Sequence, residues 1–75
     1  MINNRDKKAL IAFGKHVRKL RTGNKISQET LADNAKLSEN IIGMIERGEV
    51  NPTYTTLVQL AKGLGIPKKE LMEFD

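Results

Sequence analysis

The sequence predicts an all-α fold, a compact bundle of five short helices. Apolar residues recur every three or four positions, the spacing that gives a helix one buried side. Ser, Thr or Pro precedes most of these stretches and Gly follows several of them, as helix start and stop signals do. No stretch alternates apolar and polar residues as a half-buried strand would. The 75 residues are expected to form one domain, 1–75, because so short a chain builds a single core.

The first helix is expected from about Asp6 to Thr22. Its apolar side consists of Leu10, Phe13, Val17 and Leu20, which recur at helical spacing. The pair Gly23-Asn24 then ends the helix.

Two short helices follow, separated by a very tight turn. Ser27 caps a helix over 28–35, and Ser38 caps the next one, which closes on Gly48. Only two residues lie between the second helix and the cap of the third, so the two helices must cross steeply. This arrangement is a helix-turn-helix, spanning about 27–47.

The C-terminal third contains two further helices. Thr53 caps the fourth, Gly65 stops it, and its apolar stripe is Leu57, Leu60, Ala61 and Leu64. Pro67 can begin a short fifth helix in which Leu71 points inward.

Helical phase divides the third helix into two sides. Ser38, Ile42 and Ile45 form one side, and the opposite side carries Asn40, Gly43, Met44 and Arg47, with Glu39 at its edge. Glu46 falls toward the buried side, which is unfavourable for a lone carboxylate. It therefore needs a cationic partner, and Arg21 of the first helix is the candidate.

Composition excludes several kinds of protein. With no cysteine there is no disulfide framework, thiolate nucleophile or cysteine-based metal site. No stretch approaches the roughly 18 apolar residues of a membrane span, so we expect a cytoplasmic protein without a membrane partner. The single histidine, His16, lies in mid-helix, and no pair of carboxylates or nucleophile-base motif accompanies it. We therefore expect no enzyme activity, metal, cofactor or small-molecule substrate.

The net charge of +4 is unevenly distributed. Residues 1–25 contain eight cationic side chains and one acidic one, whereas residues 26–75 contain five cationic and eight acidic ones. A segment as basic as the first is either a phosphate-facing surface or an ordinary solvated helix face.

The stretches FGKHVRKLR, ISQETLA, LSENIIGMIERG, NPT and LVQLAKGLGI occur in this order between Phe13 and Met72. Together they resemble the Cro/repressor-type (XRE, lambda-repressor-like) helix-turn-helix family, over about four-fifths of the chain. The combination of SQxxLA with a capped helix ending in ERGxxNP is its most specific part. The resemblance implies a transcriptional regulator that binds double-stranded DNA through its third helix in the major groove.

The resemblance also implies roles for individual residues. The residues expected to face bases are Glu39, Asn40, Gly43 and Met44. Those expected near phosphates are Gln28, Lys36, Ser38, Arg47, Asn51 and Thr53. Arg21 and Glu46 match positions that form an internal ion pair in the family, in agreement with helical phase.

Several of these roles have plainer alternatives. Asn40 either bonds adenine or is a polar surface residue, and Met44 either meets a thymine methyl group or has no role. Glu39 either accepts from cytosine or only interacts with the helix dipole. Gly43 either lets DNA approach the backbone or merely weakens the helix. Gln28 is either a phosphate contact or a plain first-turn residue.

Several departures from the family pattern affect backbone strain or DNA binding, and modest sequence-specific affinity per monomer is expected. Lys25 and Lys36 stand where family members often have glycine at positive φ. Glu49 places an acid beside the expected DNA backbone. The side of the third helix that would face DNA has few residues that discriminate strongly between bases.

We therefore expect a repressor or controller protein that acts as a homodimer on a two-fold-related operator. The expected dimer interface is Ile66, Met72 and Phe74, unless Phe74 folds back on its own domain. The alternative function is a helix-turn-helix scaffold that serves as a protein-interaction module or antitoxin-type partner protein.

Overall fold

The computed structural model describes residues 6–74, and the regular secondary structure within them consists of helices alone. Its five helices are α1 (Lys7–Gly23), α2 (Gln28–Ala35), α3 (Glu39–Glu46), α4 (Tyr54–Leu64) and α5 (Lys68–Met72). This confirms the predicted fold class and the order and approximate limits of the helices. None of the helices in the described part of the chain is long and apolar enough to cross a membrane.

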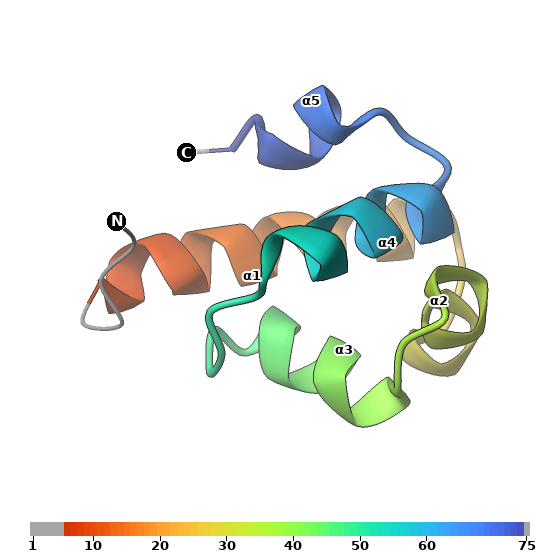
Figure 1. The fold of residues 1–75 in the computed structure, drawn as a ribbon, viewed down its shortest axis with the longest axis horizontal. Coiled ribbons are helices and arrows are strands. Elements are labelled where there is room, and N and C mark those ends of the chain that lie inside the picture. Colours follow the sequence, from red (N-terminus) through yellow and green to blue (C-terminus); the bar gives the residue numbers. More distant parts are fainter. Residues whose placement is uncertain (1–5, 75) are drawn as a thin grey trace.

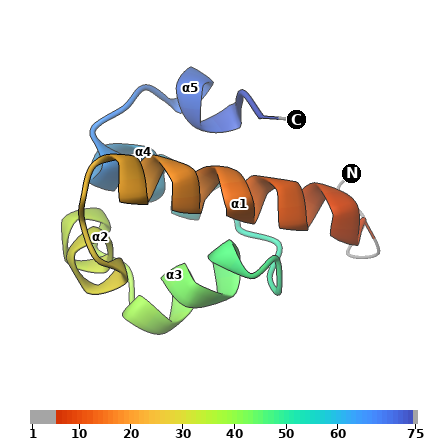
Figure 2. The ribbon, with the colours of Figure 1, turned by 180° about the vertical axis from the view of Figure 1, so that it is seen from behind.

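The helices form three levels around one core. Figures 1 and 2 show α1 and α4 in the middle level, one behind the other in these views, with α2 and α3 along one side and α5 across the other. Contacts between α2 and α4, and between α1 and α3, attach the helix-turn-helix to the central pair. The helix-turn-helix is thus held from both of its ends by a rigid support.

Hydrogen-bonding side chains begin four of the five helices. Asp6, Ser27, Ser38 and Thr53 each accept a hydrogen bond from the backbone N–H three residues later. These bonds satisfy N–H groups that have no partner inside their helix. The three predicted Ser and Thr caps are confirmed. Pro67 precedes α5 in extended conformation instead of forming its first turn, and supplies no side-chain cap.

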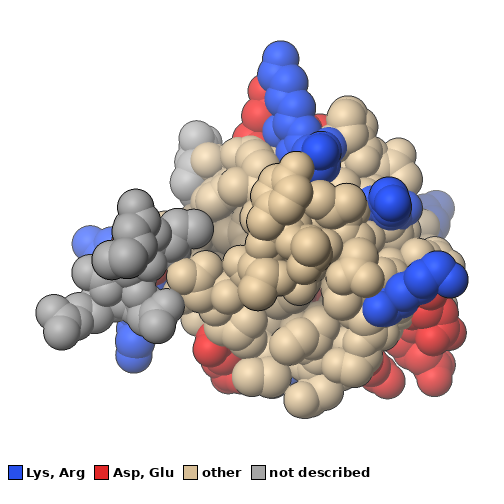
Figure 3. Space-filling model, viewed as in Figure 1, with Lys and Arg blue, Asp and Glu red and all other residues tan. Residues whose placement is uncertain are grey.

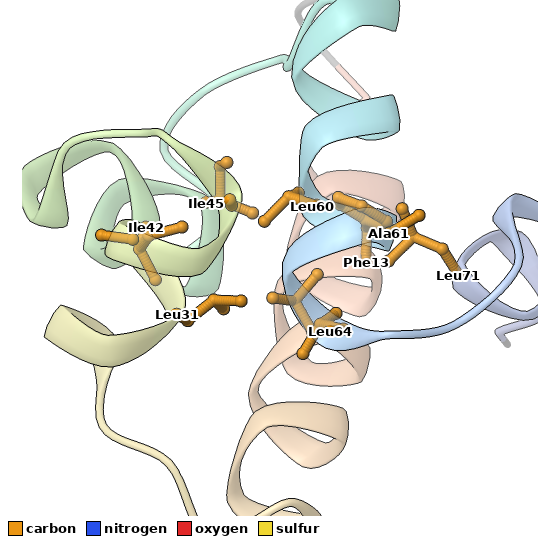
Figure 4. Close-up of a cluster of buried hydrophobic side chains, with 11 residues drawn as sticks. Phe13, Leu31, Ile42, Ile45, Leu60, Ala61, Leu64 and Leu71 are labelled. Atoms are coloured by element: carbon orange, nitrogen blue, oxygen red, sulfur yellow. The ribbon is translucent and has the colours of Figure 1, made fainter.

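The core lies between the helix-turn-helix and α4. Figure 4 shows Leu31, Ile42 and Ile45 directed toward Leu60 and Leu64 of α4, while Leu71 covers the other end of the cluster. Leu31, Ile42, Leu60 and Leu71 are fully buried. The burial of each such side chain contributes about 1.5–3 kcal/mol to the stability of the fold. The apolar stripes predicted from the sequence therefore supply the core.

Two glycines allow the helices to approach closely. A Cβ on Gly14 of α1 would lie 2.4 Å from the carbonyl oxygen of Ile45, at the end of α3. A Cβ on Gly63 of α4 would lie 2.7 Å from the Cβ of Ala35 in α2. Both neighbours are backbone or short side chains that cannot swing aside. Glycine at these positions therefore sets how near the helix-turn-helix lies to its support.

Lys25 and Lys36 adopt the left-handed conformation that the sequence predicted. Their φ angles are 59° and 57°, a region in which a residue with a Cβ is strained. Lys36 ends α2, and its N–H bonds the carbonyls of Ala32 and Asp33. The strain is the cost of a turn tight enough to bring α3 directly after α2.

Gly63→Ala is expected to destabilise the fold by about 1–3 kcal/mol, because the added methyl group overpacks the contact between α4 and α2. Gly23→Ala is the matched control, since a Cβ there would meet nothing within 4 Å. Urea unfolding followed by circular dichroism compares the two. Equal free energies of unfolding for both variants would contradict the close approach at Gly63.

Candidate nucleic-acid interface

The exposed side of α3 forms the centre of the site. Glu39, Asn40 and Arg47 are exposed, and Met44 is half-buried. The Asn40 amide nitrogen lies 3.7 Å from the sulfur of Met44, one turn further along the helix. Gly43 differs from expectation, because it is buried although helical phase places it on this side. We call these five residues the reading face.

The reading face borders a shallow hollow that also reaches α2. Gln28, Glu39, Asn40, Gly43 and Arg47 line it. The side chains come from the first turns of α2 and α3 and from the end of α3. Polar groups from both helices of the helix-turn-helix therefore converge on one exposed surface.

Most of the residues expected near phosphates are partly or fully exposed at helix starts and in the turn before α3. Lys36 is exposed in the turn between α2 and α3. The hydroxyl of Ser38 caps α3 by accepting from Ile41 N at 3.1 Å, which leaves its proton to donate. Thr53 is exposed at the start of α4, and Asn51 is half-buried just before it. The starts of α3 and α4 thus both present polar side chains to the outside.

Arg21 and Glu46 form the predicted ion pair. Arg21 Nε lies 2.6 Å from Glu46 Oε2, and Arg21 Nη2 lies 3.1 Å from Oε1. The Arg21 and Glu46 side chains are only 12% and 4% exposed. The hydrogen bond to Glu46 raises the pKa of Arg21 above its usual value, so the guanidinium stays charged. Arg21 Nη1 also donates to the carbonyl of Ile26 at 2.9 Å.

Gln28 has a contact that sequence reasoning missed. Its side-chain nitrogen donates to Glu46 Oε1 at 3.0 Å, so the amide group points toward the ion pair. The expectation was a side chain directed at phosphate. A nearly buried carboxylate needs donors for both oxygens, and Gln28 is placed to supply one. Only the predicted proximity of α2 and α3 could have suggested this bond.

Arg47 and Glu49 form a second, exposed ion pair. Arg47 Nε donates to Glu49 Oε2 at 3.0 Å, and both side chains are more than half exposed. The hydrogen bond raises the pKa of Arg47. Solvent screens such a pair, so it contributes little to stability. Its importance lies in where it holds the Arg47 side chain.

The C-terminal segment corrects part of the dimer prediction. The centroid of the Phe74 ring lies 5.4 Å from that of Phe13 and 5.7 Å from that of His16. Phe74 therefore folds back on α1 of its own chain. Ile66 also packs against the core. Met72 is 49% exposed and remains available to a partner. The Phe74 ring is tilted against Phe13 and stacked on His16, so these two side chains partly bury it.

The fold and the exposed side of α3 together define a helix-turn-helix DNA-binding protein. The profile of the HTH_3 family, described as helix-turn-helix, matches residues 17–71. The chain belongs to this family and is a DNA-binding transcriptional regulator.

Several relatives have similar sequences and structures. The chain is 35% identical to control protein C.BamHI of Bacillus amyloliquefaciens over 85% of its own length and 80% of the relative's. It is 43% identical to control protein C.SmaI of Serratia marcescens over 75% of its own length and 69% of the relative's. The crystal structure of the restriction-modification controller protein C.AhdI from Aeromonas hydrophila superposes with a TM-score of 0.84 at 38% identity. That match covers 87% of this chain and 98% of C.AhdI.

Glu46→Ala is expected to destabilise the protein by about 3–5 kcal/mol, because Arg21 would be left as a buried charge without its partner. Urea unfolding measures the loss. Replacing Arg21 and Glu46 together with apolar residues should be milder than either single change. A Glu46→Ala variant within about 0.5 kcal/mol of wild type would show that the pair has no role in stability.

Proposed function

We propose that this regulator binds double-stranded DNA by placing α3 in the major groove, and that it acts as a dimeric repressor or controller protein. The observation that carries the proposal is the reading face, an exposed helix side with Asn40 in its first turn. Residues at the start of a recognition helix are those that meet base edges. Asn40 would bond adenine, Met44 would meet a thymine methyl group, and Glu39 lies beside them.

The surroundings of the reading face suit the DNA backbone. Lys36 would supply a charge to phosphate, and Ser38, Asn51 and Thr53 would supply hydrogen bonds. The N-termini of α3 and α4 add N–H groups and the positive ends of two helix dipoles. These contacts would orient α3 on the duplex without selecting a sequence.

A dimer is supported by the surface of α4 and α5. Figure 3 shows a broad area without charged side chains in the middle of the face over α4. Tyr54 of α4 is 65% exposed and Met72 of α5 is 49% exposed. We propose that this surface, with Tyr54 and Met72, packs against a second copy. Two reading faces about 34 Å apart would then meet the same side of the duplex.

The regulatory role is supported by the relatives. C.BamHI and C.SmaI are control proteins, and C.AhdI is a restriction-modification controller protein. Their lengths are close to that of this chain, so the similarity covers most of each protein. We propose that this chain likewise controls transcription through a short operator.

Asn40→Ala is expected to weaken binding to the preferred duplex by about 1–3 kcal/mol and leave binding to random duplex nearly unchanged, because it removes a bidentate base contact. Lys36→Ala is the matched comparison. It should weaken binding to the preferred and the random duplex equally, because it removes a phosphate contact. The slope of log K against log salt concentration should fall by about one unit. Fluorescence anisotropy titrations at several salt concentrations measure both. Equal losses on the two duplexes for Asn40→Ala would exclude it from base reading.

Met72→Glu is expected to convert the dimer to a monomer at micromolar concentration, because it places a charge in an apolar interface. Ile11→Glu is the control, since Ile11 is also exposed, at 42%, but lies on α1. Sedimentation equilibrium without DNA reports the mass of each. A wild-type monomer, or a Met72→Glu variant that still dimerises, would refute this interface.

A further inference from the structure

Arg47 ends α3, but its charged group lies further back along the helix. A Cβ built on Gly43 would stand 3.0 Å from Arg47 Nη1 and 3.8 Å from Nη2. The side chain therefore runs one turn toward the N-terminus of α3, the direction that helical side chains favour. The guanidinium covers the backbone of Gly43, which explains why that residue is buried on an exposed side of the helix.

Glu49 fixes one edge of this guanidinium. Its carboxylate binds Arg47 Nε at 3.0 Å. The two Nη groups remain on the other side, over Gly43 and the hollow that Asn40 also lines. The sequence analysis placed Arg47 on the exposed side of the helix and expected it to contact phosphate. In the structure its donors lie in the middle of the reading face.

We propose that Arg47, seated on Gly43, reads a guanine in the major groove, and that Glu49 is the positioning residue that orients it. This inference rests on the proposed function and names a base that α3 recognises. A guanidinium donates two parallel hydrogen bonds to O6 and N7 of guanine, a pattern that no other base presents. Asn40, one turn before the guanidinium, would read the neighbouring base pair. Glycine favours this position, because a Cβ there would stand 3.0 Å from Arg47 Nη1 and push the guanidinium away from the backbone.

Glu49 has two opposing effects in this arrangement. Its charge repels the phosphates of any duplex, which lowers affinity without regard to sequence. Its hydrogen bond holds the Arg47 side chain in place before DNA binds. Less conformational entropy is then lost when Arg47 contacts its base. Removing Glu49 should therefore raise affinity for random DNA and reduce discrimination at the same time. A purely repulsive acid would change only the first.

The seat on Gly43 is tested with Arg47→Lys, Gly43→Ala and the control Gly23→Ala. The preferred duplex is first obtained by selecting bound sequences from a random pool with the wild-type protein. Arg47→Lys keeps the charge, so it should lose about 5- to 150-fold on the preferred duplex, the range for one bidentate base contact, and little on random duplex. Gly43→Ala should reduce discrimination at the same G·C pair without lowering the Tm, because Ala favours a helix. Gly23→Ala should change neither the discrimination at this G·C pair nor the Tm.

The role of Glu49 is tested with Glu49→Ala and Glu49→Gln. Both remove the charge, so both should bind random duplex more tightly and to a similar extent. Glutamine keeps an oxygen that accepts from Arg47 Nε, so it should retain most of the discrimination that alanine loses. In an Arg47→Lys background, Glu49→Ala should no longer change discrimination at that base pair.

The possible results separate the inference from the proposed function. A wild-type protein that selects no sequence refutes both. Two outcomes would overturn the inference alone and make Arg47 a phosphate contact. In one, no G·C pair of the selected site is sensitive to Arg47→Lys; in the other, Arg47→Lys loses equal affinity for the preferred and the random duplex. Glu49→Ala with unchanged discrimination overturns the positioning role of Glu49. Loss at one G·C pair in Arg47→Lys, Gly43→Ala and Glu49→Ala supports the inference.

Discussion

The carboxylate of Glu46 joins three helices, and the orientation of the reading face depends on it. Arg21 reaches this carboxylate from α1 and Gln28 reaches it from α2, while Glu46 itself ends α3. Removing two charges from water is unfavourable, and their attraction offsets that loss only when the remaining donors and acceptors are satisfied. Both Glu46 oxygens accept hydrogen bonds here, and Arg21 also donates to the carbonyl of Ile26. Apolar side chains could fill the same space with equal stability. A paired set of hydrogen bonds has preferred angles as well as distances, so it also fixes how α3 is turned relative to α1.

A close backbone approach in the same region supports this orientation. Gly14 of α1 lies against the carbonyls of Ile45 and Glu46, where even a methyl group would not fit. Gly63 has the equivalent role between α4 and α2. The helix-turn-helix therefore packs against the central helices with no room for a side chain at these two points. A recognition helix gains from such rigidity, because each base contact requires correct placement and any freedom lost on binding reduces affinity.

Most of the fold could be predicted because its signals are local. The caps Ser27, Ser38 and Thr53 act on backbone groups three residues away, and the apolar stripes follow from helical periodicity. The Arg21–Glu46 pair could be predicted from helical phase, because a carboxylate on a buried side must have a partner. The bond of Gln28 to Glu46, the return of Phe74 to α1 and the position of Arg47 over Gly43 could not. Each depends on side-chain conformations and on distances between helices that spacing along the chain does not determine. The contacts with DNA remain predictions.

The energetics of DNA recognition explain why an acid beside the reading face can be useful. A regulator must distinguish its operator from a large excess of other sites, so the ratio of specific to non-specific affinity matters more than either affinity alone. A lysine beside the DNA backbone, as proposed for Lys36, would raise both affinities, whereas an acid such as Glu49 would lower both through its charge. If Glu49 also orients Arg47, the specific complex recovers part of that loss through its guanine contact, and the random complex does not.

Each bidentate contact distinguishes bases by about 1–3 kcal/mol, so a single reading face with few strong readers discriminates weakly. Two copies held by α4 and α5 would double the number of such contacts while the acid keeps non-specific binding low. A sparsely equipped recognition helix is then compatible with selective binding, provided that it is rigid and paired.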